Sequence, residues 1–163
     1  MMAWAKTGDR RLKVVHHTSA SPLEVWAVLS NGWLYALWVV GTARIRAVDD
    51  GWPAVGTKVH HSVGVWPLLL DDETTVLEVE SGTRLVLQPK GWPAGEARVE
   101  LTLERDEDRR PHGTIITIVE DAVNGPGALA PKGLRQPVIA ARNGEALRRL
   151  AAVAEDRTHP ERG

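Results

Sequence analysis

Between residues 42 and 121 the chain repeatedly alternates apolar and polar residues over short segments separated by turn-forming residues. The segments with this strand-like pattern are 42–48, 55–65, 74–80, 84–88, 97–104 and 114–121. The intervening stretches are rich in turn residues, for example Asp49-Asp50-Gly51-Trp52-Pro53 and Ser81-Gly82. Connections this short leave no room for crossover helices, so the pattern predicts an antiparallel meander. Pro67 is expected to keep the residues directly after it out of a central strand.

The residues before this meander predict one strand followed by two short helices. The strand is expected over residues 11–17. Ser21, Pro22 and Glu24 then form a capping box with proline at the first helical position. We expect this helix to run to about Leu29, and a second short helix to cover residues 33–38.

The last part of the chain predicts a long amphipathic helix from Pro137 to about Glu155. At about 100° per residue, one face gathers Ile139, Ala146, Leu147, Leu150, Val153 and Ala154. Asn143 also lies on this face, whereas Arg142, Glu145, Arg148 and Arg149 lie outside it. An antiparallel sheet must cover one of its faces, and this helix can do so. The fold class is therefore α+β, with seven antiparallel strands, one long C-terminal helix and two short helices between strands one and two.

Composition excludes several classes of function. The 163 residues fit a single domain, for which we expect an ordered core over residues 10–156. The net charge of −1 gives no general attraction to nucleic acid, and the absence of cysteine rules out disulfides and thiolate chemistry. The longest apolar run, residues 65–70, is too short for stable membrane insertion, and the N-terminus has no secretory signal. We therefore expect a cytoplasmic protein, and the abundance of Arg, Ala, Gly and Val suggests a bacterial source.

Three stretches resemble the SRPBCC (START-like) superfamily, in particular its polyketide cyclase/dehydrase-like branch. They are residues 20–26, residues 38–41 with Gly56-Thr57, and residues 113–121 with 142–147. The resemblance extends from about Arg11 to Glu155. It implies a helix-grip fold, in which a curved sheet wraps around the C-terminal helix and leaves a cavity for a small apolar or amphipathic ligand. Members of this superfamily include lipid carriers, cyclases and co-chaperones.

The expected cavity has apolar walls and an aromatic lid. The chain has seven tryptophans and no phenylalanine, and tryptophan suits cavity rims as well as cores. Trp38 matches a position near the cavity mouth in the superfamily, while Trp66 either covers the opposite wall or caps a strand end. The walls are expected to be formed by Leu77, Leu87, Val99, Leu101, Ile116 and Ile118.

Three polar residues on expected apolar faces are candidates for ligand contacts or catalysis. Asn143 either orients a ligand or makes a structural hydrogen bond, because a buried amide needs a partner. Of the adjacent His60 and His61, only one can face inward, and we choose His61 as either an acid/base group or a core histidine. Glu120 is a base, a partner for an inward His or Arg, or a strand-end residue in solvent.

Two further patterns do not predict a site. Residues 125–130 imitate a phosphate-binding G-x-G-x-x-A loop, but no strand follows the helix to complete a βαβ unit. Adjacent histidines on a strand cannot converge on one ion, so we expect no metal and no cofactor.

The sequence therefore predicts a protein that binds a small hydrophobic or amphipathic molecule, such as a lipid. Two alternatives remain open, namely a polyketide cyclase or aromatase using His61, Glu120 and Asn143, and a protein–protein adaptor of the co-chaperone type. The sequence does not decide whether the chain is an enzyme.

Overall fold

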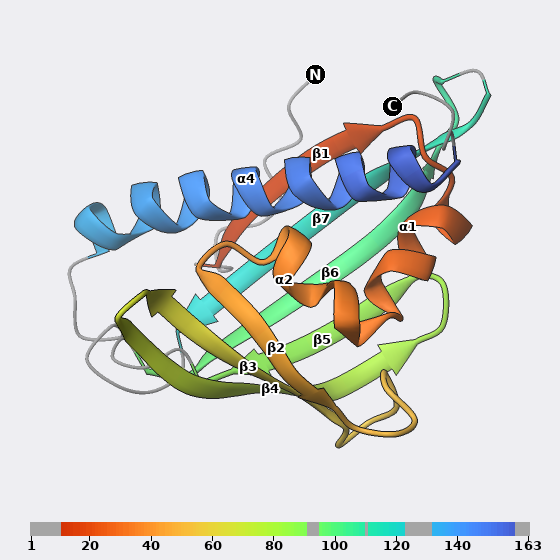
Figure 1. The fold of residues 1–163 in the computed structure, drawn as a ribbon. Coiled ribbons are helices and arrows are strands. Elements are labelled where there is room, and N and C mark those ends of the chain that lie inside the picture. Colours follow the sequence, from red (N-terminus) through yellow and green to blue (C-terminus); the bar gives the residue numbers. More distant parts are fainter. Residues whose placement is uncertain (1–10, 91–94, 110, 123–131, 159–163) are drawn as a thin grey trace.

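The computed structural model describes residues 11–90, 95–109, 111–122 and 132–158 (Figure 1). Its strands are β1 (Leu12–Thr18), β2 (Thr42–Val48), β3 (Lys58–Val65), β4 (Leu68–Glu80), β5 (Arg84–Pro89), β6 (Ala97–Asp106) and β7 (Gly113–Ala122). Its helices are α1 (Pro22–Leu29), the 3₁₀ turn η1 (Gly32–Leu34), α2 (Tyr35–Trp38) and α4 (Lys132–Thr158).

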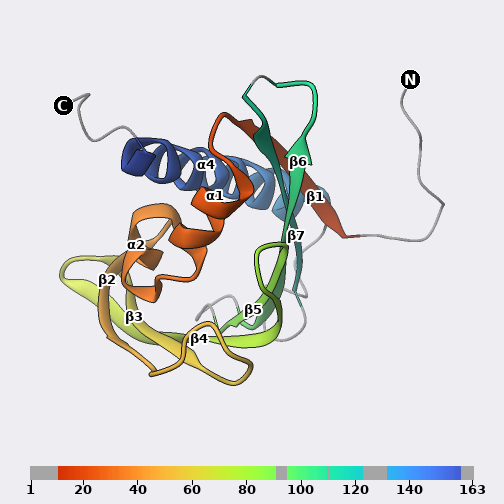
Figure 2. The ribbon, with the colours of Figure 1, turned by 90° about the vertical axis from the view of Figure 1, so that its right-hand side faces the viewer.

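All seven strands form one antiparallel sheet in the order β1-β7-β6-β5-β4-β3-β2. The sheet bends strongly, and α4 and the short helices lie in its hollow (Figure 2). This arrangement confirms the predicted α+β fold, including the long C-terminal helix and the short helices between the first two strands.

The first helix begins as its sequence predicts. The Ser21 side chain accepts a hydrogen bond from the backbone N–H of Glu24, and the Glu24 carboxylate accepts one from the backbone N–H of Ser21 at 2.7 Å. These reciprocal bonds satisfy two amide groups that would otherwise lack partners. Val25 and Val28 then point into the core, so α1 fills one end of the bent sheet.

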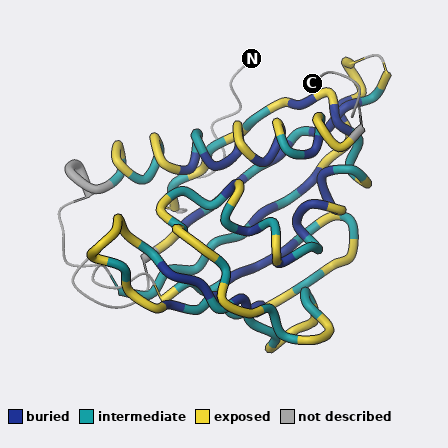
Figure 3. Tube along the Cα trace, viewed as in Figure 1, coloured by how far each residue is buried: buried dark blue, intermediate teal, exposed yellow. Residues whose placement is uncertain are grey.

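Helix α4 buries the face that the sequence predicts, and Figure 3 shows its buried residues recurring on the side turned to the sheet. The fully buried members of this face are Leu147, Leu150 and Ala154, which pack into the core. The helix begins at Lys132, five residues before the predicted start, and contains Pro137 within it. A proline near a helix start removes one backbone hydrogen bond without ending the helix, which is why the predicted boundary was wrong.

Strand β4 differs from its prediction in two ways. It begins at Leu68, because Trp66 and Pro67 form the turn between β3 and β4, and its first residues pair with β3 alone. A register shift between Val76 and Glu78 then interrupts the alternation. Thr74 and Val76 are buried before the shift, and Val79 packs against the core after it. Simple alternation over residues 74–80 predicts that Thr75, Leu77 and Val79 share the inward face, and this prediction is wrong because only Val79 points to the core.

Candidate functional site

A cavity of about 430 Å³ lies between the sheet and the N-terminal half of α4. This volume falls within the usual range of small-molecule pockets, about 300–1,000 Å³. Six strands, from β2 to β7, contribute to its wall together with α2 and α4. The lining residues are Tyr35, Trp38, Val39, Val40, Thr42, His61, Val63, Asp72, Leu87, Pro89, Gly95, Glu96, Ala97, Val99, Ile118, Glu120, Val138, Ile139, Arg142, Asn143 and Ala146.

The cavity lies at one end of the sheet because the other end is filled. There, α1 and the C-terminal half of α4 close over the strands with Val28, Leu147 and Leu150 in a continuous core. Towards the start of α4, Val138 and Ile139 line the cavity without being fully buried, and the next positions of the cavity-facing side are the polar Asn143 and the short Ala146. Short and polar residues at this point leave the space between helix and sheet open.

Two polar side chains of the cavity wall, those of Tyr35 and His61, are linked through Thr74, which is fully buried and does not itself line the cavity. Tyr35 on α2 and Thr74 on β4 are joined by a hydrogen bond of 2.8 Å between their hydroxyl oxygens. Nε2 of His61 on β3 lies 3.0 Å from the same Thr74 Oγ1. Burial lowers the pKa of His61 and raises that of Tyr35, so both side chains are neutral at pH 7.

The second polar group lies where α4 faces β7. Glu120 is 8% exposed and accepts a hydrogen bond from Arg142, which forms an ion pair with it. Asn143, the next residue on the helix, is 4% exposed. Of the alternatives for Glu120, the structure therefore agrees with that of a partner for an arginine, because the carboxylate is buried and ion-paired with Arg142.

Three buried polar atoms of the cavity wall have no hydrogen-bond partner among the described residues. They are Nδ1 of His61, Oε2 of Glu120 and Nδ2 of Asn143. A buried polar atom without a partner costs about 1–3 kcal/mol. All three belong to residues that line the cavity, so it carries polar atoms without partners in the described residues as well as apolar surface.

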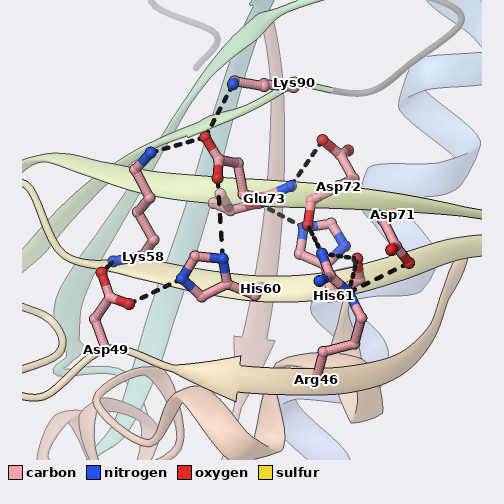
Figure 4. A network of polar contacts seen from close by, with 10 residues as sticks. Arg46, Asp49, Lys58, His60, His61, Asp71, Asp72, Glu73 and Lys90 are labelled. Atoms are coloured by element: carbon pink, nitrogen blue, oxygen red, sulfur yellow. Dashed lines mark hydrogen bonds and ion pairs between the residues drawn. The ribbon is translucent and has the colours of Figure 1, made fainter.

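His60 points away from the cavity into a charged network on the outer face of the sheet (Figure 4). Its Nε2 lies 2.8 Å from Oδ1 of Asp49. In the same network Glu73 pairs with Lys58 at 2.8 Å and with Lys90 at 2.9 Å, and these ammonium groups lower the pKa of Glu73 to about 2. The prediction that His61 is the inward histidine is thus confirmed, and its role in binding stays a prediction.

The structure brings seven of the predicted site residues to the cavity wall. These are Trp38, His61, Leu87, Val99, Ile118, Glu120 and Asn143. Leu101 and Ile116 lie further along their strands in the closed core and are fully buried. Leu77 falls at the register shift in β4 and does not line the cavity. Trp66 is 81% exposed at the turn between β3 and β4, so it covers no wall of the cavity.

Sequence reasoning missed four polar residues that line the cavity or are linked to its wall. Tyr35 lies in the expected helix 33–38, for which the sequence predicts no polar role. Alternation over residues 74–80 turns Thr74 outward, and Asp72 precedes that expected strand. Arg142 was placed outside the buried face of α4, and its side chain is indeed 45% exposed, but its long stem reaches Glu120. The sequence does contain a signal for Tyr35, because it is the one hydroxyl-bearing residue in an otherwise apolar helix.

No group of three or more potential metal ligands occurs within the described residues. The phosphate-loop imitation at residues 125–130 lies outside the part of the chain that the structure describes. Among the helices that are described, none combines the length and the apolar character needed to cross a membrane.

Comparison with known proteins identifies the fold. No protein-family model and no curated protein sequence matches the chain. Protein NE0264 from Nitrosomonas europaea superimposes with a TM-score of 0.70 at 17% identity, over 93% of this chain and 99% of its own. The di-domain ARO/CYC StfQ from the steffimycin biosynthetic pathway gives 0.70 at 12% identity over 91% of this chain, which spans 51% of StfQ.

The structure of Ara h 8.0201 is also similar, with a TM-score of 0.65 at 13% identity, over 91% of this chain and 99% of its own. At such low identities these likenesses establish the architecture alone. They agree with the expected helix-grip architecture, while membership of the SRPBCC superfamily and of its polyketide cyclase/dehydrase-like branch stays a prediction.

Proposed function

We propose that this protein binds a small, mainly apolar molecule with polar substituents in the cavity between α4 and the sheet. The observation that carries the proposal is the combination of a largely apolar cavity of about 430 Å³ with three buried polar atoms that lack partners in the described residues. Apolar contact supplies affinity in such a pocket, and a few polar groups fix the orientation of the ligand. The aromatic ring of Trp38, 4% exposed, closes one side.

The test uses the freshly purified protein and a cavity-filling variant. Ala146 lines the cavity on α4, whereas Ala152 lies on the exposed face of the same helix. We expect native mass spectra of the wild type and of Ala152→Phe to show a retained lipophile, or their melting temperatures to rise with members of a lipophile panel. Ala146→Phe is expected to remain folded and to lose both effects.

An unoccupied wild-type protein whose melting temperature no lipophile changes would contradict the proposal. Equal binding by both phenylalanine variants would place the ligand somewhere other than this cavity. Mass spectrometry after denaturation would identify a retained molecule directly.

A second candidate function is that of a cyclase or aromatase acting on a poly-β-ketone. The specific observation in its favour is that His61 and Tyr35, linked through Thr74, line a chamber that can hold a reactive chain and exclude water. A neutral histidine can exchange protons with an enolising ketone. The likeness to StfQ, described as an ARO/CYC, is compatible with this candidate.

The enzyme hypothesis is tested by measuring cyclisation of a poly-β-ketone substrate by His61→Ala and Glu120→Gln. Loss of turnover with a nearly unchanged melting temperature supports catalysis by these residues. Loss of folding in both variants would instead assign them a structural role.

A further inference from the structure

The chain of Tyr35, Thr74 and His61 restricts where protons can lie in the cavity wall. Thr74 Oγ1 receives both contacts, at 2.8 Å from the Tyr35 hydroxyl and at 3.0 Å from His61 Nε2. It carries one proton and two lone pairs, so it can donate only one of these two bonds. The Tyr35 hydroxyl has Thr74 as its hydrogen-bond partner among the described residues and is buried.

Only one direction of the chain uses every hydroxyl proton. If Tyr35 donates to Thr74, then Thr74 donates to His61 Nε2, and the proton of the neutral imidazole lies on Nδ1. If the chain runs the other way, the buried Tyr35 proton has no acceptor within the described residues. If Tyr35 and His61 both donate to Thr74, the threonine proton loses its acceptor instead. The first direction leaves only the Nδ1–H donor of His61 without a partner, whereas each of the other two leaves a hydroxyl proton and also the Nδ1 lone pair without one. Unpaired buried polar groups are unfavourable, so the first direction prevails.

We propose that His61 presents an Nδ1–H donor to the bound molecule, and that this molecule is a neutral compound with a carbonyl-type oxygen at that position. This inference rests on the proposed function of the cavity. Nδ1 of His61 has no partner among the described residues, and a donor needs an acceptor oxygen. A side-chain amide at Asn143 provides a further donor from the α4 side.

The charges of the cavity wall favour a neutral ligand over an anion. Three carboxylates, those of Asp72, Glu96 and Glu120, line the cavity, and the one guanidinium in its described lining, that of Arg142, is already ion-paired with Glu120. Like charges at short range repel strongly in a partly buried site. A ketone or ester oxygen accepts the His61 proton without adding charge, whereas a carboxylate ligand would increase the repulsion.

The proton position can be measured without any ligand. Long-range ¹H–¹⁵N correlation spectra at pH 7 distinguish the two neutral tautomers of an imidazole and the protonated ring, and the His61 signals are assigned by their absence in His61→Phe. We expect the Nδ1–H tautomer in the wild type. We expect Tyr35→Phe, which removes the donor at the start of the chain, to increase the Nε2–H tautomer. A wild-type Nε2–H tautomer or a protonated ring would overturn the inference.

The ligand preference is measured with two probes of the same shape, 1-tetralone and tetralin, which differ by one carbonyl oxygen. We expect the wild type to bind the ketone about tenfold more tightly than the hydrocarbon, the effect of one additional hydrogen bond. His61→Phe is expected to bind both probes about equally while retaining tetralin affinity. Equal binding of both probes by the wild type would overturn the ligand inference and leave the cavity function standing. Binding of neither probe would count against the cavity function, and the tautomer spectrum would then decide the proton position alone.

Discussion

Replacing Asn143 with leucine tests whether the buried polar side chain at the cavity lowers the free energy of unfolding of the protein. Asn143 is 4% exposed, and its Nδ2 atom has no partner among the described residues. Removing a buried unsatisfied amide recovers about 1–3 kcal/mol, and leucine also favours helix by up to about 0.5 kcal/mol. The adjoining cavity of about 430 Å³ accommodates the larger side chain.

We therefore expect Asn143→Leu to raise the free energy of unfolding by about 1–3 kcal/mol and the melting temperature by about 3–10 °C. The affinity for a polar-substituted lipophile should fall at the same time. Urea denaturation and ligand titration of the same preparations measure both quantities.

Gly144→Ala is the matched control, because it changes the neighbouring residue of the same helix. A Cβ at this position meets only the far end of the Arg148 side chain, at 3.7 Å. Alanine should stabilise the helix by about 1 kcal/mol and leave ligand affinity unchanged. If Asn143→Leu lowered stability by more than about 1 kcal/mol, the amide would have a structural partner and the reasoning would be refuted.

Three further predictions concern other parts of the molecule. Gly113→Ala should destabilise the protein by about 3 kcal/mol or more, because its Cβ would lie 2.1 Å from the Thr18 carbonyl oxygen; near-wild-type denaturation would disprove this close approach. Glu73→Gln should cost about 1–2 kcal/mol at pH 7 after allowance for solvent screening. Since the folded-state pKa of Glu73 is about 2, below the usual glutamate value of 4.5, the wild-type advantage should persist above pH 4.5 and disappear as the pH falls towards 2; an advantage independent of pH would exclude the ion pairs as its source. Trp66→Ser, at a residue 81% exposed, should change the melting temperature by less than about 1 °C and leave cavity binding intact, and a loss of binding would show that this turn contributes to the site.

Much of the fold follows from local patterns that depend on few tertiary contacts. The capping box at Ser21 sets the start of α1, and the boundaries of β2, residues 42–48, agree with those expected from alternation. The buried face of α4 follows from helical periodicity because this helix covers only one side of the sheet. For the site, the same reasoning placed Asn143 on the buried face and His61 inside.

The remaining features depend on which residues meet across the fold. The register shift after Val76 arises in the pairing of β4 with β5, and it reverses the inward face in a way that alternation within β4 cannot reveal. Helix α4 extends through Pro137 to Lys132, beyond what the local proline signal suggests.

The sequence by itself determined the order and type of the elements, because capping, turn chemistry and periodicity are properties of neighbouring residues. Only the tertiary structure decided that Tyr35, Thr74 and His61, from three separate elements, form one hydrogen-bonded chain. It also decided that Arg142 neutralises Glu120 beside Asn143. The physical reason is that a cavity is the space left after helix and sheet pack, so its chemistry depends on distances between elements that local patterns do not contain.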